Sequence, residues 1–235
     1  MIIGIIPARG GSKRILKKNI RPFCGQPMIK YSIDAALNSG VFDKVVVSTD
    51  CDEIAEAAIK SGAEVPFRRS TNLADDFSGI EKVIPDAIQA VESKENPASF
   101  VCCVLATAPF LRAAELKSGF GMLSTGHWDY VVSATDFAFP VFRGFQKMDD
   151  ESLKMLYPEH YHTRSQDLPK VWHDAGQFYW GTRNAWMEER DLFSHRSTIV
   201  PIPRLRAIDI DTPDDWEFAE ALYQVGAVKD GDARL

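Results

Sequence analysis

The stretch IIGIIPARGGSKRILKKN, residues 2–19, joins a short apolar run to a loop with two adjacent glycines and many basic side chains. Residues 2–6 are apolar and mostly β-branched, which is typical of a strand that is buried on both faces. Gly10 and Gly11 allow the backbone to turn sharply after that strand and bring N–H groups close to an anion. We therefore predict a first β-strand that leads directly into an anion-binding loop.

The chain beyond this loop alternates apolar runs with amphipathic segments. The predicted elements are helices at residues 28–38, 52–61 and 213–224 and strands at residues 44–49, 100–105, 129–134 and 199–210. Strands that alternate with helices indicate βαβ units, and therefore an α/β fold with a mainly parallel sheet and helices on both faces. Ligands bind such sheets beyond the carboxyl ends of the strands, so the loops after Ile6, Thr49 and Leu105 are the candidate sites.

The segment from about residue 137 to residue 181 breaks this alternation because it is irregular and rich in aromatic residues. We expect an arm that closes over a substrate or crosses to a second subunit, and an ordinary antiparallel extension of the core is an equally open alternative. Residues 1–228 are expected to form one domain that includes this segment. Residues 229–235 are polar and are expected to form a flexible tail.

The charge balance narrows the range of partners. The chain has 27 basic and 33 acidic residues, for a net charge of -6. A nucleic acid or an anionic membrane would be repelled, so neither is expected as a partner. The sequence has no run of about 18 apolar residues, so no transmembrane helix is predicted. The N-terminal stretch lacks the pattern of a secretory signal, so we expect a cytoplasmic location.

The basic loop is the strongest functional signal in the sequence. Six cationic side chains lie within residues 9–21, namely Arg9, Lys13, Arg14, Lys17, Lys18 and Arg21. Together with backbone N–H groups, such side chains form a binding site for a polyphosphate. The loop contains neither GxxxxGK[ST] nor GxGxxG, so it is neither a Walker A loop nor a dinucleotide-binding loop. A solvated basic loop is the alternative interpretation.

A second signal is the pair of carboxylates in IDIDTP, residues 208–213. In a strand, side chains two positions apart share a face, so Asp209 and Asp211 would lie together. Two neighbouring carboxylates repel each other unless a cation lies between them. Mg²⁺ is the natural cation beside a triphosphate, because it prefers oxygen ligands and bridges phosphates. In the alternative interpretation, Asp211 only belongs to the start of the following helix.

Five motifs in order resemble the CMP-sialic acid synthetase superfamily, the acylneuraminate cytidylyltransferases. They are ARGGSKRILKKN at residues 8–19, VSTD at 47–50, FRRSTNLADD at 67–76, LATAPFLR at 105–112 and DIDTPDDW at 209–216. The resemblance covers nearly the whole chain. It implies a Rossmann-like nucleotide-diphospho-sugar transferase fold, CTP as a substrate, Mg²⁺ as the cofactor and a homodimer. Leu16 departs from the pattern, since family members usually have proline there.

The resemblance also implies roles for individual residues. The implied nucleotide-binding residues are Ala8, Arg9, Gly10, Gly11, Ser12, Lys13, Lys18, Asn19, Arg69 and Ser78. The implied catalytic residues are Arg9, Lys13, Lys18 and Asp211. Asp209 and Asp211 would hold the metal. The FRRSTNLADD motif is weaker by itself, because its charged residues are also compatible with a surface charge cluster.

The sugar is indicated by two segments. Ala106 stands where N-acetylneuraminate synthetases usually carry a glutamine that contacts the sugar, and the loss of that amide favours a less polar substituent. The segment WHDAGQFYWG, residues 172–181, is similar to that of pseudaminic acid cytidylyltransferases. We therefore expect pseudaminic acid, with N-acetylneuraminate and legionaminate as alternatives. The candidate sugar-binding residues are Ala106, Thr107, Arg164, His173 and Gln177.

The predicted reaction is nucleotidyl transfer. The anomeric hydroxyl of the sugar attacks the α-phosphorus of CTP, and pyrophosphate leaves. Whether Asp209 or Asp211 also takes the proton from the hydroxyl is left open by the sequence. The alternative of another class is a nucleotide-binding regulator without turnover. The intact charged residues count against it, namely Lys13, Lys18, Asp209 and Asp211. An NAD-linked oxidoreductase is disfavoured by the missing GxGxxG motif.

Overall fold

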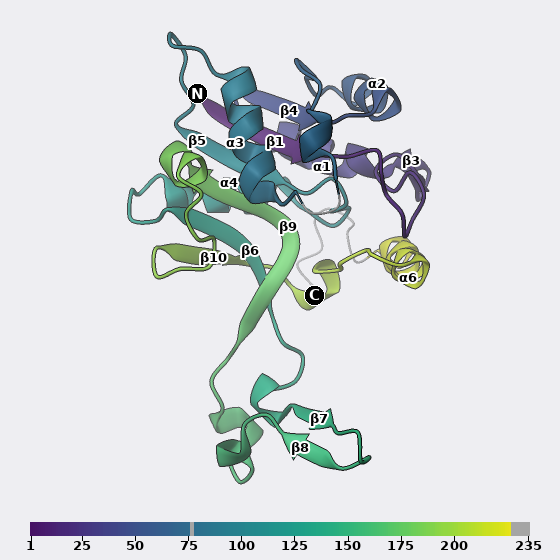
Figure 1. Cartoon of the computed structure of the whole chain (residues 1–235), viewed down its shortest axis with the longest axis vertical. Coiled ribbons are helices and arrows are strands. Elements are labelled where there is room, and N and C mark those ends of the chain that lie inside the picture. The colour runs from purple at the N-terminus through teal and green to yellow at the C-terminus, as the bar shows by residue number, and fades with distance from the viewer. Residues whose placement is uncertain (76–77, 227–235) are drawn as a thin grey trace.

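A six-stranded β-sheet forms the centre of the computed structural model, which describes residues 1–75 and 78–226 (Figure 1). The strands are β1 (Ile2–Pro7), β4 (Lys44–Ser48), β5 (Phe100–Val104), β6 (Tyr130–Asp136), β9 (Trp172–Thr182) and β10 (Ser197–Pro201). Their order is β10-β6-β9-β5-β1-β4, and all neighbours are parallel except that β9 runs antiparallel to β5 and β6. This sheet confirms the predicted α/β class. The tail predicted at residues 229–235 lies outside the described residues.

Helices cover both faces of the sheet, as predicted. One face carries α1 (Met28–Ser39), α2 (Asp52–Lys60) and α4 (Ala113–Leu123), and the other carries α3 (Ile80–Val91) and α5 (Arg183–Met187). In β5, Cys102 packs on the side of α1 and α4, and Cys103 packs on the side of α3 and α5. Burial on both faces explains why the strands are continuously apolar. Within the described ranges, no helix is long and apolar enough to cross a membrane.

The predicted helices and most predicted strands are confirmed to within two residues at either end. For example, α1 ends at Ser39 and is followed by Gly40, whose φ of 64° is the left-handed conformation that favours glycine. The prediction of strands over residues 199–210 is wrong beyond the end of β10. Pro201 is still paired with Ala134, and the N–H of Ile202 donates to the carbonyl oxygen of Ala134, but Pro203 has no N–H to donate and the pairing does not continue beyond it. The chain then continues through a 3₁₀ turn at Arg204–Arg206 and an extended segment.

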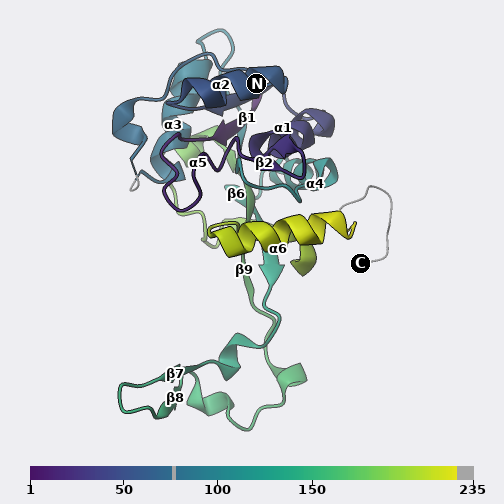
Figure 2. The same ribbon diagram turned by 90° about the vertical axis from the view of Figure 1, so that its right-hand side faces the viewer.

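An arm projects from the sheet between β6 and β9 (Figures 1 and 2). It comprises residues 137–171 and contains the antiparallel pair β7 (Phe145–Lys147) and β8 (Leu153–Met155). The sequence analysis expected the arm to extend to residue 181, but residues 172–181 belong to β9 in the sheet. The aromatic residues of the segment therefore have two origins. Phe178 and Trp180 are core residues of β9, whereas Phe139 and Phe145 are exposed on the arm.

Besides the apolar cores on the two faces of the sheet, a separate apolar cluster fixes the basic loop against the C-terminal helix α6 (Pro213–Gln224). Ile15, in the middle of the loop, is buried in this cluster. The other buried members are Phe23, Met28, Phe110, Ile210, Trp216 and Ala219. Phe23 belongs to β2 (Pro22–Phe23), which pairs with β3 (Gln26–Pro27) directly after the loop. The cluster therefore joins the loop after β1 to the segment before α6.

Candidate active site

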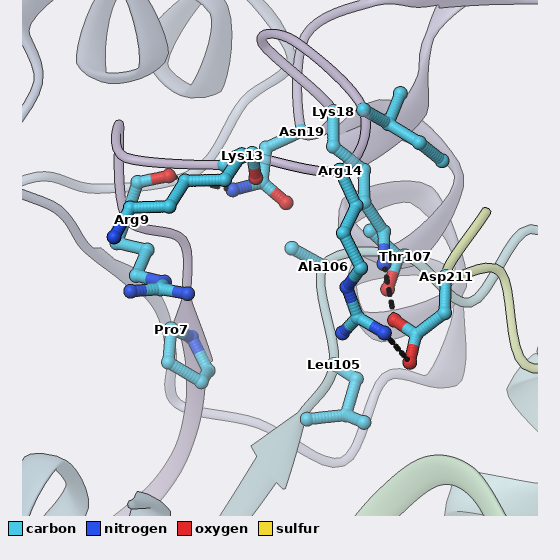
Figure 3. A pocket seen from close by; sticks show the side chains of 12 residues that line it. Pro7, Arg9, Lys13, Arg14, Lys18, Asn19, Leu105, Ala106, Thr107 and Asp211 are labelled. Carbon is cyan, nitrogen blue, oxygen red and sulfur yellow. Dashed lines mark hydrogen bonds and ion pairs between the residues drawn. The ribbon is translucent and has the colours of Figure 1, made fainter. Parts of the chain in front are cut away.

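A cavity of about 270 Å³ opens beyond the carboxyl ends of β1 and β5 (Figure 3). Three segments form it: the basic loop, the loop after β5 and the segment before α6. Its lining residues are Pro7, Arg9, Ser12, Lys13, Arg14, Ile15, Lys18, Asn19, Leu105, Ala106, Thr107 and Asp211. This edge of a mainly parallel sheet is where such folds bind ligands. The structure thus brings together predicted nucleotide, sugar and metal residues from both ends of the chain.

The basic loop is held in place by hydrogen bonds to its own backbone. Asn19 donates from Nδ2 to the carbonyl oxygen of Arg9 at 2.9 Å. The N–H of Gly10 donates to Oδ1 of Asp50 at 2.9 Å, so a carboxylate of the protein itself takes the hydrogen bond that the sequence predicted for a bound anion. A Cβ atom at Gly10 would lie 2.9 Å from the Cβ atom of Cys51. Gly10 is therefore required for close approach to the loop after β4.

The cations of the cavity lie in two groups. Figure 3 shows Arg9 and Lys13 on one side, and Arg14 and Lys18 beside Asp211 on the other. Lys18 Nζ lies 3.2 Å from Asp211 Oδ1, and Arg14 Nη1 lies 2.8 Å from Asp211 Oδ2. Four cations against one lining carboxylate leave the cavity positively charged. Such a surface is suited to a polyphosphate.

The position of Asp211 is set by the start of α6. The carboxylate of Asp215 accepts the backbone N–H groups of Asp211 at 3.0 Å and Thr212 at 2.7 Å. Thr212 caps the helix in return, because its Oγ1 accepts the N–H of Asp215. Ile210 is fully buried beneath this turn. Asp211 is therefore fixed at the cavity without the β-strand that was predicted to align Asp209 and Asp211.

Asp209 lies near Asp211 but does not line the cavity. Burial of its carboxyl group raises the pKa of Asp209, and the negative charge of Asp211 raises it further. A divalent cation between the two carboxylates would relieve both effects. No cluster of three or more His, Cys, Asp or Glu residues suited to a metal occurs among the described residues. The pair fits an ion such as Mg²⁺, which takes its remaining ligands from phosphates and water.

Five predicted nucleotide residues do not line the cavity, namely Gly10 and Gly11 of the basic loop, Ala8, Arg69 and Ser78. Ala8 is buried at the end of β1. Arg69 is buried, and its guanidinium donates to the side-chain and backbone oxygens of Ser48 at the end of β4. Burial lowers the pKa of Arg69. Ser78 bonds within its own loop, because Oγ donates to the carbonyl oxygen of Asn72 at 3.3 Å. Arg69 therefore stabilises the end of β4, two residues before Asp50.

Three predicted sugar residues also lie outside the cavity lining. Gln177 is only 2% exposed, and its Nε2 donates to the carbonyl oxygen of Arg206, so it is a core residue of β9. His173 is exposed at the root of the arm, where its ring centroid lies 4.7 Å from that of Phe137. Arg164 lies on the arm, where Nε donates to Oδ2 of Asp167 at 2.7 Å.

Comparison with known proteins decides the class of this site. The model of the family described as Cytidylyltransferase matches residues 3–231. The chain belongs to the cytidylyltransferase family. This confirms the predicted resemblance and the prediction of a CTP-dependent nucleotidyltransferase.

The relatives of this cytidylyltransferase include enzymes for acidic sugars. A pseudaminic acid cytidylyltransferase from Campylobacter jejuni is 46% identical over 221 residues, which cover 94% of this chain and 95% of the relative. A CMP-N,N'-diacetyllegionaminic acid synthase from Legionella pneumophila is 30% identical, over 95% of this chain and 97% of the relative. A solved structure of CMP:2-keto-3-deoxy-manno-octonic acid synthetase complexed with CTP matches with a TM-score of 0.69, 17% identity, and coverage of 95% of this chain and 98% of that one. The last match shows the fold.

Two site features of the cytidylyltransferase were not assigned from its sequence. Arg14 was counted among the loop cations but given no role, and its ion pair with Asp211 joins residues far apart in the chain. Asp50, in the VSTD motif, was given no role either, and it anchors the basic loop through Gly10. Neither contact is local in sequence. The only signals for these roles were the basic composition of the loop for Arg14 and the position of Asp50 in the VSTD motif.

Proposed function

We propose that this cytidylyltransferase couples CTP to pseudaminic acid and releases pyrophosphate. The observation that carries the proposal is the cation-lined cavity, in which residues of the phosphate-binding loop face Asp211 and Ala106. The 46% identity to a pseudaminic acid cytidylyltransferase over nearly the whole chain supports the choice of sugar. We place the reaction in the cytoplasm, where CTP is available.

The cations of the cavity account for the chemistry of the transfer. As the anomeric hydroxyl attacks the α-phosphorus, negative charge grows on the phosphate oxygens and the departing pyrophosphate. Arg9, Lys13 and Lys18 line the cavity that would receive these groups. Fixed charges at such positions stabilise the transition state without a reorganisation of solvent.

Asp209 and Asp211 are the residues that would hold Mg²⁺. The ion would supply further neutralisation of the triphosphate and orient it for in-line attack. The raised pKa of Asp209, caused by burial and then by Asp211, supports this assignment because a bound cation would remove the penalty on the second negative charge.

Ala106 is the proposed contact with the sugar. It is buried at the floor of the cavity between the two groups of cations, and its methyl group offers no hydrogen bond. A site without a polar group at this position favours a sugar that presents an apolar substituent there. Thr107, the next lining residue, supplies the polar contact nearby.

We also propose that the arm contacts a second copy of the chain. Phe145 and Leu153 are 60% and 66% exposed on the β7–β8 pair, and they line a shallow apolar hollow together with Met155 and Tyr161. A single copy leaves this apolar surface in water, which a homodimer would avoid. The exposed Arg164 lies on the arm and the exposed His173 lies beside it. Their predicted contacts with the sugar therefore depend on the position that the arm takes in such a dimer.

The experiment that tests the proposed function offers three acidic sugars in parallel. Pyrophosphate release is measured with CTP, Mg²⁺ and either pseudaminate, N-acetylneuraminate or 3-deoxy-manno-octulosonate. We expect release with pseudaminate in clear preference to the other two. Preference for N-acetylneuraminate would keep the enzyme class and overturn the role of Ala106.

A further inference from the structure

Arg14 occupies an unusual place for a phosphate-binding cation, because it is paired with a carboxylate of the proposed metal site. Its Nη1 atom lies 2.8 Å from Oδ2 of Asp211, and Lys18 Nζ lies 3.2 Å from Oδ1 (Figure 3). Both oxygens of Asp211 therefore have a cationic partner. A divalent cation that binds Asp211 must share or replace one of these partners.

Electrostatics disfavours sharing. A guanidinium and a divalent cation on the same carboxylate oxygen would lie within a few ångströms of each other as like charges. The side chains differ in how firmly the fold holds them. The Lys18 side chain is 16% exposed, whereas the Arg14 side chain is 68% exposed. Separating Arg14 from Asp211 should therefore require less free energy than separating Lys18 from it.

The same cavity offers Arg14 a second partner once a nucleotide is bound. A triphosphate brings several negative charges next to the basic loop, and a guanidinium binds phosphate oxygens with two parallel hydrogen bonds. Arg14 lines the cavity, so its guanidinium reaches such oxygens through side-chain rotation alone. Exchange between Asp211 and phosphate requires no movement of the buried loop residue Ile15.

We propose that Arg14 is an exchangeable counter-ion of the active site. It neutralises Asp211 in the nucleotide-free enzyme, and it transfers to the triphosphate when CTP and a divalent cation bind together. This inference rests on the proposed metal role of Asp211. Arg14 thereby opposes binding of the metal alone and favours binding of the metal with the nucleotide, which is a positive coupling between the two ligands.

The test compares Arg14→Gln with Lys17→Gln, which removes a cation from the same loop. Lys17 pairs with Glu53 at 2.6 Å and does not line the cavity, so it is a matched control. Mn²⁺ affinity is measured by electron paramagnetic resonance, first without nucleotide and then with a non-hydrolysable CTP analogue. For Arg14→Gln we expect Mn²⁺ alone to bind about three- to tenfold tighter and the analogue to bind about tenfold weaker, the scale of one charged contact. Lys17→Gln should change neither affinity.

Tighter binding of Mn²⁺ together with weaker binding of the analogue distinguishes exchange of Arg14 from simple phosphate binding by Arg14. If Arg14→Gln leaves the affinity for Mn²⁺ alone unchanged or weakens it, Arg14 does not compete with the metal and the inference fails. Undetectable Mn²⁺ binding without nucleotide in both the wild type and Arg14→Gln would overturn it as well. Arg14→Lys, which keeps the charge, should retain most of the coupling.

A further variant separates this inference from the proposed metal site. Asp211→Asn should weaken Mn²⁺ binding in the presence of the analogue. If it does, and Arg14→Gln has no effect on Mn²⁺ alone, only the role of Arg14 is overturned. If Asp211→Asn leaves Mn²⁺ binding unchanged, the metal assignment itself fails and the inference fails with it.

Discussion

The cavity on the sheet and the arm differ in how the fold holds their side chains. Around the cavity, the loop is anchored through Gly10 to Asp50 and through Ile15 to a buried apolar cluster. On the arm, apolar residues such as Phe145 and Leu153 are mainly exposed to water. The proposed nucleotide site is therefore preformed within one chain, whereas the arm carries apolar surface that one copy does not bury.

Removal of a cavity carboxylate should have the largest effect. Asp211→Asn keeps the shape of the side chain but removes a proposed metal ligand, so turnover with CTP, Mg²⁺ and the sugar should fall by at least about 10³-fold. Pyrophosphate release measures the rate. Asp214→Asn, an exposed carboxylate in the first turn of α6, is the matched control and should keep near-normal turnover. A near-normal rate for Asp211→Asn would remove the metal assignment.

Removal of a cavity cation should have the next largest effect. Lys13→Gln takes a positive charge from the proposed triphosphate site, so kcat/KM for CTP should fall by about 10²-fold. Steady-state kinetics at saturating sugar give the value, and Lys17→Gln should retain wild-type kinetics. Equal behaviour of the two variants would show that the loop is only a solvated basic segment.

A charge on the arm should break the proposed dimer and leave the site on the sheet formed. Phe145→Asp places a carboxylate in the exposed apolar surface, so the dimer dissociation constant should rise by about thirtyfold. Light scattering across a concentration series measures it. Phe193→Asp changes an exposed aromatic residue of the sheet domain and should leave association unaltered. If Phe145→Asp associates like the wild type, the arm is not the dimer contact.

Substitution at the cavity floor should change the preferred sugar. Ala106→Gln adds an amide beside the proposed sugar site, so the ratio of kcat/KM for N-acetylneuraminate over pseudaminate should rise by about tenfold. The exposed Ala114 of α4 provides the control Ala114→Gln, which should not alter this ratio. An unaltered ratio in Ala106→Gln would show that this position does not contact the sugar.

The smallest expected effect concerns the ion pairs at the root of the arm. A hydrogen bond from Arg204, and then one from Lys170, lowers the pKa of Asp136 to about 2. A lowered carboxyl pKa adds stability above the unfolded-state pKa of about 3.9, and that stability is lost as the pH falls through about 2. Arg204→Gln should raise this pKa part of the way, because Lys170 remains 3.3 Å away. NMR titration measures it, and Arg190→Gln, which disrupts ion pairs elsewhere, should leave it unchanged.

The features that the sequence predicted correctly depend on local patterns. The strand before the basic loop and the helices α1 and α6 follow from residues close together in the chain. The helices α3 and α4 were not predicted, although each has an apolar face. Pro85 within α3 and Gly119 within α4 obscure the helical signal.

The features that the sequence did not predict depend on contacts between distant segments. The aromatic segment at residues 172–181 was grouped with the arm because nothing local indicates that β9 pairs with β5 and β6. Arg69 was assigned to the nucleotide through the family resemblance and Gln177 was named as a candidate sugar contact, and only tertiary packing reveals that both are buried. The pairing of Arg14 with Asp211 likewise required the fold.

The most direct test of the proposed cytidylyl transfer is ³¹P NMR of the wild-type enzyme with CTP, Mg²⁺ and pseudaminate. Attack on the α-phosphorus predicts one new phosphodiester resonance together with pyrophosphate, in equal amounts and at the expense of CTP. Formation of cytidine diphosphate and phosphate would mean attack at the terminal phosphorus and would contradict attack at the α-phosphorus. Unchanged CTP in the presence of folded protein that binds CTP would also contradict the proposed reaction.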